Sequence, residues 1–255
     1  MSAATAIDPD VALQDACIRY ANDPLNFVRF MFDWKHGDLA DWDGPDWWHV
    51  EVFNCINEYL NNDDPLPLRI AICSGHGVGK SAMVAWLIHW FMSCRKSPQV
   101  RCTANTESQL NTTTWREISK WNKMAMNGDW FEWTATSYYL KAQPETWKAN
   151  AIAWSENNTE AFAGVHEENV LVVFDEASKI SDKIWEVTDG VLTTKKNIWC
   201  VFGNGTRNVG RFYDCFNKNR KYWKTWNVDS RKCKASTQNG TENLESLIEQ
   251  YGGED

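Results

Sequence analysis

The chain has 255 residues and a formal net charge of −8, and 43% of its residues are hydrophobic. This length suits one large α/β domain, or one domain with appendages, that can bury a sizeable core. The acidic balance excludes a protein that coats nucleic acid with its whole surface, although it leaves a local basic face open. The longest apolar stretch is too short to span a bilayer, and we expect no signal peptide and no membrane association.

The cysteines indicate a reducing compartment. Eight of them are spread along the chain without a C-x-x-C pair, and three fall in predicted buried strands. We therefore expect packing thiols in a cytosolic protein and no zinc site.

Residues 1–64 are expected to form an acidic, helical N-terminal segment packed on the rest of the chain. They carry thirteen acidic residues against three basic ones. Apolar periodicity predicts one or two amphipathic helices over residues 8–34, punctuated at Asp23-Pro24, and a further helix over residues 47–62.

A glycine-rich turn follows the strand predicted at residues 69–73. It matches the P-loop pattern G-x-x-x-x-G-K-[ST], except that Ser74 stands at the first glycine. Its three glycines can adopt positive φ and turn backbone N–H groups toward one anion. Lys80 adds a positive charge, Ser81 offers a hydroxyl to Mg²⁺, and the next helix starts at the same phosphates. The predicted phosphate-binding residues are Ser74, Gly75, His76, Gly77, Val78, Gly79, Lys80 and Ser81.

The middle of the chain predicts more alternation of strands and helices. We expect a strand at 100–105, a helix at about 107–126, and shorter strands at 133–140 and 150–155. We interpret the apolar stripe of the helix as core rather than as a binding surface. Most of the sixteen tryptophans are interpreted in the same way.

Two adjacent acids end the buried strand predicted at 169–174. In a P-loop nucleotidase Asp175 would hold Mg²⁺, and Glu176 would polarise the water that attacks the γ-phosphate. Both carboxylates can reach one site only if the strand ends there, because side chains alternate along a strand. The alternative is an ordinary solvated strand end.

A last buried strand, predicted at 197–202, ends in the turn GNGTRN. Strands that alternate with helices in this way predict an α/β fold with a central, mostly parallel sheet flanked by helices on both faces. Ligands of such sheets bind at the carboxyl ends of the strands. The three candidate functional turns, at 74–81, 175–176 and 203–208, all follow such strand ends.

Four segments resemble, in chain order, those of the large terminase subunits of tailed bacteriophages, the ATPase motors that pump DNA into procapsids. They read SGHGVGKSA, VRCTANTESQL, VLVVFDEAS and VFGNGTRNVGRF. The resemblance implies a P-loop NTPase core of the ASCE (RecA-like) type over residues 65–235, which hydrolyses ATP with Mg²⁺ to translocate double-stranded DNA. Residues 236–255 would begin a linker to a nuclease domain, and we expect no DNA cleavage by this chain.

The resemblance also implies roles for individual residues. Lys80 and Ser81 would bind phosphate and metal, while Asp175 would orient Mg²⁺. Glu176 would activate the attacking water, and Thr206 would sense the γ-phosphate.

Two positions depart from the family pattern. GPDWWHV resembles the adenine-side segment and makes Trp48 and His49 candidate cofactor-binding residues, but His49 stands where the family commonly has Gln. His76 stands where the family loop often has Arg.

The partners implied by the resemblance are double-stranded DNA, the portal protein, the small terminase subunit and further copies in a ring on the procapsid. The isolated chain would be monomeric or weakly associated. Its location would be the cytoplasm of the infected bacterial host, with transient docking on the procapsid. Residues 205–235 carry nine basic residues against two acidic ones, which fits either a DNA-facing surface or an ordinary solvated one.

A cationic finger often completes an NTPase site, and Arg116, Arg207 and Arg211 are candidates for it, in cis or in trans. Two other functions stay open. One is a different nucleic-acid motor, such as a helicase, and the other is a non-catalytic nucleotide-binding switch, for which Glu176 would be superfluous. A small-molecule kinase is less favoured, since no second substrate site is indicated.

Overall fold

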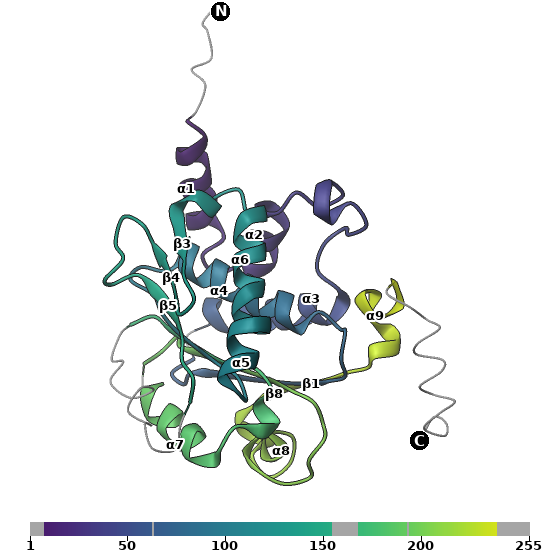
Figure 1. Ribbon diagram of the computed structural model, residues 1–255. Coiled ribbons are helices and arrows are strands. Elements are labelled where there is room, and N and C mark those ends of the chain that lie inside the picture. Colours follow the sequence, from purple (N-terminus) through teal and green to yellow (C-terminus); the bar gives the residue numbers. More distant parts are fainter. Residues whose placement is uncertain (1–7, 63, 155–167, 193, 239–255) are drawn as a thin grey trace, which may run out of the picture.

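The computed structural model describes residues 8–62, 64–154, 168–192 and 194–238. Its centre is one 8-stranded sheet with the order β3-β4-β5-β2-β6-β7-β1-β8 (Figure 1). The strands are β1 (Leu68–Ser74), β2 (Gln99–Thr103), β3 (Phe131–Trp133), β4 (Ser137–Leu140), β5 (Lys148–Ala151), β6 (Val170–Phe174), β7 (Ile198–Gly203) and β8 (Lys224–Val228). The α-helices are α1 (Pro9–Arg19), α2 (Pro24–Met31), α3 (Trp47–Asn61), α4 (Lys80–Cys94), α5 (Glu107–Gln109), α6 (Trp115–Met124), α7 (Asp182–Val191), α8 (Arg211–Phe216) and α9 (Lys234–Gln238).

Six of these strands, from β5 to β8 in the sheet order, run parallel to one another. β4 pairs antiparallel with β5, and β3 pairs antiparallel with β4. β6 and β7 are buried along their whole length, as is usual for parallel strands covered on both faces. The predicted α/β fold with a mostly parallel sheet is confirmed, and the carboxyl ends of β1, β6 and β7 lie at one edge.

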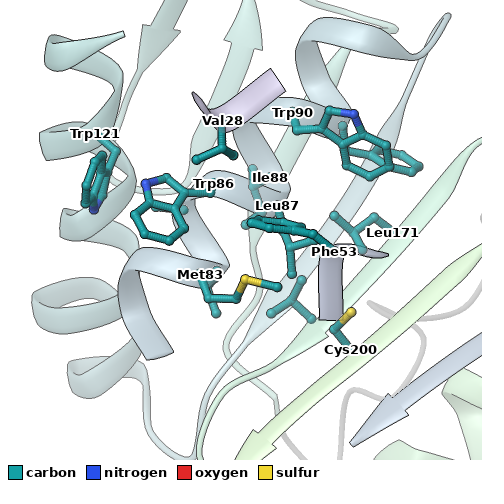
Figure 2. Close-up of a cluster of buried hydrophobic side chains, with 14 of the residues drawn as sticks. Val28, Phe53, Met83, Trp86, Leu87, Ile88, Trp90, Trp121, Leu171 and Cys200 are labelled. Atoms are coloured by element: carbon teal, nitrogen blue, oxygen red, sulfur yellow. The ribbon is translucent and has the colours of Figure 1, made fainter. Parts of the chain in front are cut away.

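Two hydrophobic clusters cover the two faces of the sheet. Residues from α2, α3, α4 and α6 form the larger cluster, and residues from α7 and α8 form the smaller one. Figure 1 shows these two groups of helices on opposite sides of the sheet. Residues 83–92 of α4 are all buried, because this helix is apolar around most of its circumference. Figure 2 shows Met83, Trp86, Leu87 and Trp90 among side chains of α2, α3 and α6.

The first helices pack on α4 within the larger cluster. Asp8 and Asp23 cap α1 and α2 through their side chains, and a proline follows each of them at the start of the helix. Trp90 Nε1 donates a 3.1 Å hydrogen bond to Tyr20 O. The helices predicted over 8–34 and 47–62 are confirmed. The boundary at residue 64 stays a prediction, and most of the predicted linker, residues 239–255, lies outside the described residues.

The structure departs from the predicted elements in three places. A π-helical turn, Leu110–Thr114, interrupts the helix predicted at 107–126. The single strand predicted at 133–140 is instead the end of β3, a turn at 134–136 and the whole of β4. The backbone N–H of Thr134 closes the turn by donating to the carbonyl of Ser137. β8 lacks a clear sequence signal, because it is an edge strand that exposes two of its five residues. None of the described helices is both long and apolar enough to cross a membrane.

Candidate active site

The phosphate loop, residues 74–81, joins β1 to the N-terminus of the 15-residue helix α4. Gly77 and Gly79 adopt φ of +73° and +91°, a region that favours glycine. The expectation of positive φ is wrong for Gly75. Glycine has a different effect there, since a Cβ would lie 2.5 Å from Ser230 Oγ and would force that hydroxyl to move. Gly75 therefore lets the segment after β8 approach the loop closely.

The first turn of α3 holds the loop from inside the protein. Trp48 Nε1 donates a 3.1 Å hydrogen bond to Val78 O, and His49 Nε2 lies 3.2 Å from Gly79 O. Both side chains are buried, Trp48 completely. These two predicted cofactor-binding residues thus hold the loop by its carbonyl groups, and a contact between them and a ligand stays a prediction.

The protonation of His49 follows from its partners. The backbone N–H of Asp46 donates to His49 Nδ1, so Nε2 carries the proton and donates to Gly79 O. Burial lowers the pKa of His49 from 6.5 to about 3, so the ring is neutral near pH 7. A Cβ at Gly79 would lie 3.0 Å from this ring. His49 and Gly79 therefore fit each other closely, and the loop rests on a neutral imidazole.

Lys80 bridges the loop and the turn after β7. Its ammonium donates hydrogen bonds to Gly75 O at 2.8 Å and to Asn204 Oδ1 at 2.7 Å. Asn204 Nδ2 in turn lies 3.1 Å from His76 Nε2. Burial lowers the pKa of Lys80, while two nearby carboxylates, Asp175 first, oppose that shift. Lys80 is thus a positioned cation at the carboxyl edge of the sheet.

Asp175 and Glu176 directly follow β6 and are only 4% and 9% exposed. Asp175 accepts hydrogen bonds from the Thr114 hydroxyl and from the backbone N–H of Glu176. Burial raises the pKa of Asp175, and the hydrogen bond from Thr114 opposes this increase. Glu176 adopts φ 52° and ψ 40°, in the left-handed region. The strand therefore ends at Phe174, as predicted, and the chain turns sharply at the second acid.

An open cavity of about 600 Å³ lies between the phosphate loop, the turn after β7 and the end of β8. Ser74, Gly75 and His76 line it from the loop, and Thr206 lines it from the turn. Arg231 lines it from the segment after β8. We call this space the phosphate cavity.

A second cavity, of about 260 Å³, borders the loop at Gly77 and Gly79. His49 lines it from α3, and Ala82 lines it from the first turn of α4. Four tryptophans also contribute to its wall: Trp34, Trp42, Trp86 and Trp121. We call this space the tryptophan cavity.

No family model matches the sequence. The "Probable terminase, large subunit" of Enterobacteria phage P7 is 32% identical to this chain over 149 residues, which are 56% of this chain and 30% of that protein. The chain therefore spans about a third of the length of this curated relative.

Solved structures of phage terminases share the fold. The HK97 bacteriophage large terminase has a TM-score of 0.65 at 10% identity, over 91% of this chain and 51% of that one. The large terminase of a thermophilic bacteriophage, in complex with ADP, has a TM-score of 0.58 at 11% identity, over 82% and 50%. The ATPase domain of the Thermus phage P74-26 large terminase has a TM-score of 0.53 at 14% identity, over 72% and 82%.

The chain has the fold of a large terminase ATPase domain. In this terminase fold, Lys80 and the two acids after β6 lie close enough for their charges to interact. Ser81 is half-buried in the first turn of α4. Thr206 is exposed and reaches the phosphate cavity rather than Lys80, whose side-chain partner in the same turn is Asn204.

The three predicted finger arginines occupy different environments in the terminase fold. Arg211 pairs with Asp189 at 2.7 Å, and Arg69 pairs with the same carboxylate at 2.9 Å. Arg211 therefore belongs to a cluster that ties α8 to α7 and β1. Arg116 and Arg207 are exposed.

Three residues of the candidate site were not predicted from the sequence. Asn204 could have been found, because it lies in the same turn as Thr206. Thr114 carried no signal, since its contact with Asp175 depends on the π-helical turn. The only sequence signal of Arg231 was its positive charge, because β8, the strand that brings it to the cavity, was not predicted.

The residues present fit a magnesium–nucleotide site rather than an all-protein metal cage. The described part of the chain holds no group of three or more His, Cys, Asp or Glu side chains that could bind a metal. Mg²⁺ in nucleotide sites typically takes one or two protein ligands, with phosphates and waters completing its shell. Asp175 and the Ser81 hydroxyl match that ligand set in number and chemistry.

Proposed function

We propose that this chain is the ATPase motor part of a phage terminase large subunit, which hydrolyses ATP to translocate double-stranded DNA into a procapsid. The observation that carries the proposal is the convergence of Lys80, Asp175, Glu176 and Asn204 at the carboxyl edge of three adjacent parallel strands. The similarity to the phage P7 protein, whose name describes a probable terminase large subunit, supports it.

The proposed ligand is ATP with Mg²⁺. Backbone N–H groups of the phosphate loop and the N-terminus of α4 favour the phosphates, and Lys80 neutralises part of their charge. Ser81 and Asp175 would hold Mg²⁺, which supplies further charge neutralisation to the phosphate oxygens when bound. The tryptophan cavity begins at Gly79 and Ala82, so it is the proposed place for the adenine ring, with His49 in its wall.

The proposed reaction is phosphoryl transfer to water. The water oxygen forms a bond to the γ-phosphorus, and the bond from that phosphorus to the β–γ bridging oxygen breaks with its electron pair going to ADP. Glu176 accepts a proton from the attacking water, and the products are ADP and inorganic phosphate. Both acids are buried, so their electrostatic effect on bound groups is stronger than in water.

The turn after β7 is proposed to transmit the release of phosphate to the surface that grips DNA. The Lys80 ammonium donates hydrogen bonds to Gly75 O and Asn204 Oδ1. A bound phosphate competes for the same ammonium, so the turn responds to nucleotide through Asn204. Thr206, exposed in the same turn, is the proposed γ-phosphate sensor.

The proposed partners are those of a packaging motor: double-stranded DNA, the portal protein, the small terminase subunit and neighbouring copies in a ring. The exposed residues Arg116 and Arg207 remain candidates for a finger that acts on a neighbouring subunit. DNA contacts from the basic stretch 205–235 should be mostly to phosphate, so affinity should fall steeply as salt rises. The proposed location is the cytoplasm of the infected host, on the procapsid during packaging.

The decisive test compares Glu176→Gln with a matched control, Glu186→Gln, on the exposed side of α7. Glu176→Gln should keep ATP binding in calorimetry and lose ATP turnover by at least about a hundredfold, the usual range for a general base. The control should behave like wild type. Undiminished turnover in Glu176→Gln would contradict the proposed reaction, and nucleotide binding without turnover in wild type would favour the switch alternative. Strand displacement on forked DNA would favour the helicase alternative.

A further inference from the structure

The segment after β8, residues 229–237, lies against the phosphate loop. Ser230 Oγ occupies the space in which a Cβ of Gly75 would lie, and Ser236 Oγ donates a 3.3 Å hydrogen bond to Gly77 O. Cys233, between these two serines, is completely buried. The segment thus contacts the loop at two points and has a buried anchor of its own.

The acidic N-terminal segment fixes the other side of residues 229–237. The backbone N–H of Lys234 donates to Asp46 Oδ2 at 2.7 Å, and its ammonium lies 2.7 Å from Asp43 Oδ1. Asp46 also caps α3, the helix that supports the loop from inside. The position of Arg231 relative to the loop is therefore set by contacts on both sides of it.

Arg231 lines the phosphate cavity, and its side chain is half exposed. Its guanidinium is oriented by Asp229, which accepts from Nε at 3.0 Å and from Nη2 at 3.0 Å. Asp229 also accepts the backbone N–H of Arg231 at 3.0 Å. A guanidinium held in this way on a cavity wall suits an anion that enters the cavity, because charge-assisted contacts to phosphate are geometrically specific.

We propose that Arg231 binds the terminal phosphate of the nucleotide held by its own phosphate loop, with Asp229 as the residue that positions it. The inference rests on the proposed function, since it assigns a residue to the same site. The cavity that Arg231 shares with His76 and Thr206 is also lined by Gly75 and Asn204, the residues whose oxygens accept from the Lys80 ammonium. A phosphate bound to that ammonium would therefore lie beside this cavity. Arg231 therefore acts in cis, on the nucleotide of its own subunit. It belongs to the segment that follows β8, the last strand in the described part of the chain.

The test measures the affinity of a non-hydrolysable ATP analogue and of ADP, with Mg²⁺, for the full chain and for Arg231→Ala, Arg231→Lys and Arg220→Ala. Arg220 is an exposed arginine of the same basic stretch that lines a different groove, so it is the matched control. Arg231→Ala should weaken analogue binding by at least about tenfold, the worth of a hydrogen bond to a charged group, and leave ADP binding within about twofold. Arg231→Lys should recover part of the loss, and Arg220→Ala should match wild type.

Equal losses for the analogue and ADP, or no loss for either, would overturn the assignment. If a cation from a neighbouring subunit bound the phosphate instead, the preference for the analogue would grow with protein concentration. A residue in cis gives the same preference in dilute solution. If wild type binds neither nucleotide, the proposed function fails and takes this inference with it. Loss of the preference for the analogue in Arg231→Ala alone supports the assignment and is compatible with the proposed function. Thermal melts of each variant check folding, and Arg231→Lys carries the test if the alanine variant is unfolded.

Discussion

The Lys80 ammonium donates a 2.7 Å hydrogen bond to Asn204 Oδ1, which lies 124 residues later in the chain. This contact links the phosphate loop to the turn after β7. Asn204 also lies 3.1 Å from His76 Nε2, so one amide side chain contacts the loop at two positions. The turn and the loop are therefore expected to respond together to a bound phosphate.

Asn204→Ala should lower ATP turnover by about tenfold and leave ADP affinity nearly unchanged. The reason is that the ammonium of Lys80 loses a charge-assisted partner that orients it. Steady-state hydrolysis and calorimetry check this expectation, with Asn208→Ala, an exposed position in the same turn, as the control. Wild-type turnover in Asn204→Ala would mean that Gly75 O alone positions the cation.

Thr114→Val should move the acidic limb of the ATPase pH profile to higher pH. The Thr114 hydroxyl donates to Asp175, and this hydrogen bond lowers a carboxyl pKa that burial raises. Its removal raises the pKa further, so Asp175 becomes protonated, and unfit to bind a cation, at a higher pH. Thr114→Ser keeps the hydroxyl and should keep the wild-type limb. Coincident profiles for valine and serine would contradict the role given to the hydroxyl.

His89 should make the stability of the fold depend on pH. It is buried between Tyr138 and Asn127, and burial lowers its pKa from 6.5 to about 4. The contribution of the neutral ring to the free energy of unfolding is fully present above pH 6.5. It decreases by about 1.4 kcal/mol per pH unit as the pH falls toward the folded-state pKa. His49 acts in the same direction.

The measurement for His89 is urea unfolding at about pH 7.5 and about pH 5. His89→Gln removes one titrating ring, so its unfolding free energy should fall less between the two pH values than that of wild type. Equal falls would show that the ring does not titrate as expected.

Arg211→Ala should lower the free energy of unfolding by about 1 kcal/mol, because the partly exposed pair with Asp189 is lost. Turnover should stay near the wild-type value, also in mixtures with wild-type chains. Thermal melts and hydrolysis assays check both parts, with the exposed Arg220→Ala for comparison. A variant with wild-type stability that loses turnover only in assembled motors would make Arg211 the finger after all.

The sequence predicted the parts of the fold that depend on local apolar patterns. The strands before Asp175 and before the GNGTRN turn are fully buried, and the strand before the phosphate loop is mostly buried. Each contains a continuous apolar run, which in β1 covers residues 70–73. β8 was not predicted, because this edge strand exposes two of its five residues and contains no such apolar run. The π-helical turn escaped for a related reason, since its residues are compatible with a regular helix and tertiary contacts decide the difference.

The candidate site was predictable where one short segment carries several chemical groups. Lys80 and Glu176 stand in such segments. The supporting contacts of Trp48, His49 and Thr114 were not predictable, because they span long sequence separations and only the folded chain creates them. Trp48 and His49 were predicted as cofactor-binding residues instead. Gly75 is an example: its sequence context indicates a turn, but not that Ser230 Oγ lies where a Cβ at this position would clash with it.

The left-handed backbone of Glu176 carries a thermodynamic consequence. A non-glycine residue in that conformation costs of the order of 1 kcal/mol or more relative to an unstrained one. Glycine at this position would therefore give a protein that melts at a higher temperature and no longer turns over ATP. The chain thus has a lower thermal stability because it keeps an acidic side chain at the residue where the backbone turns away from β6.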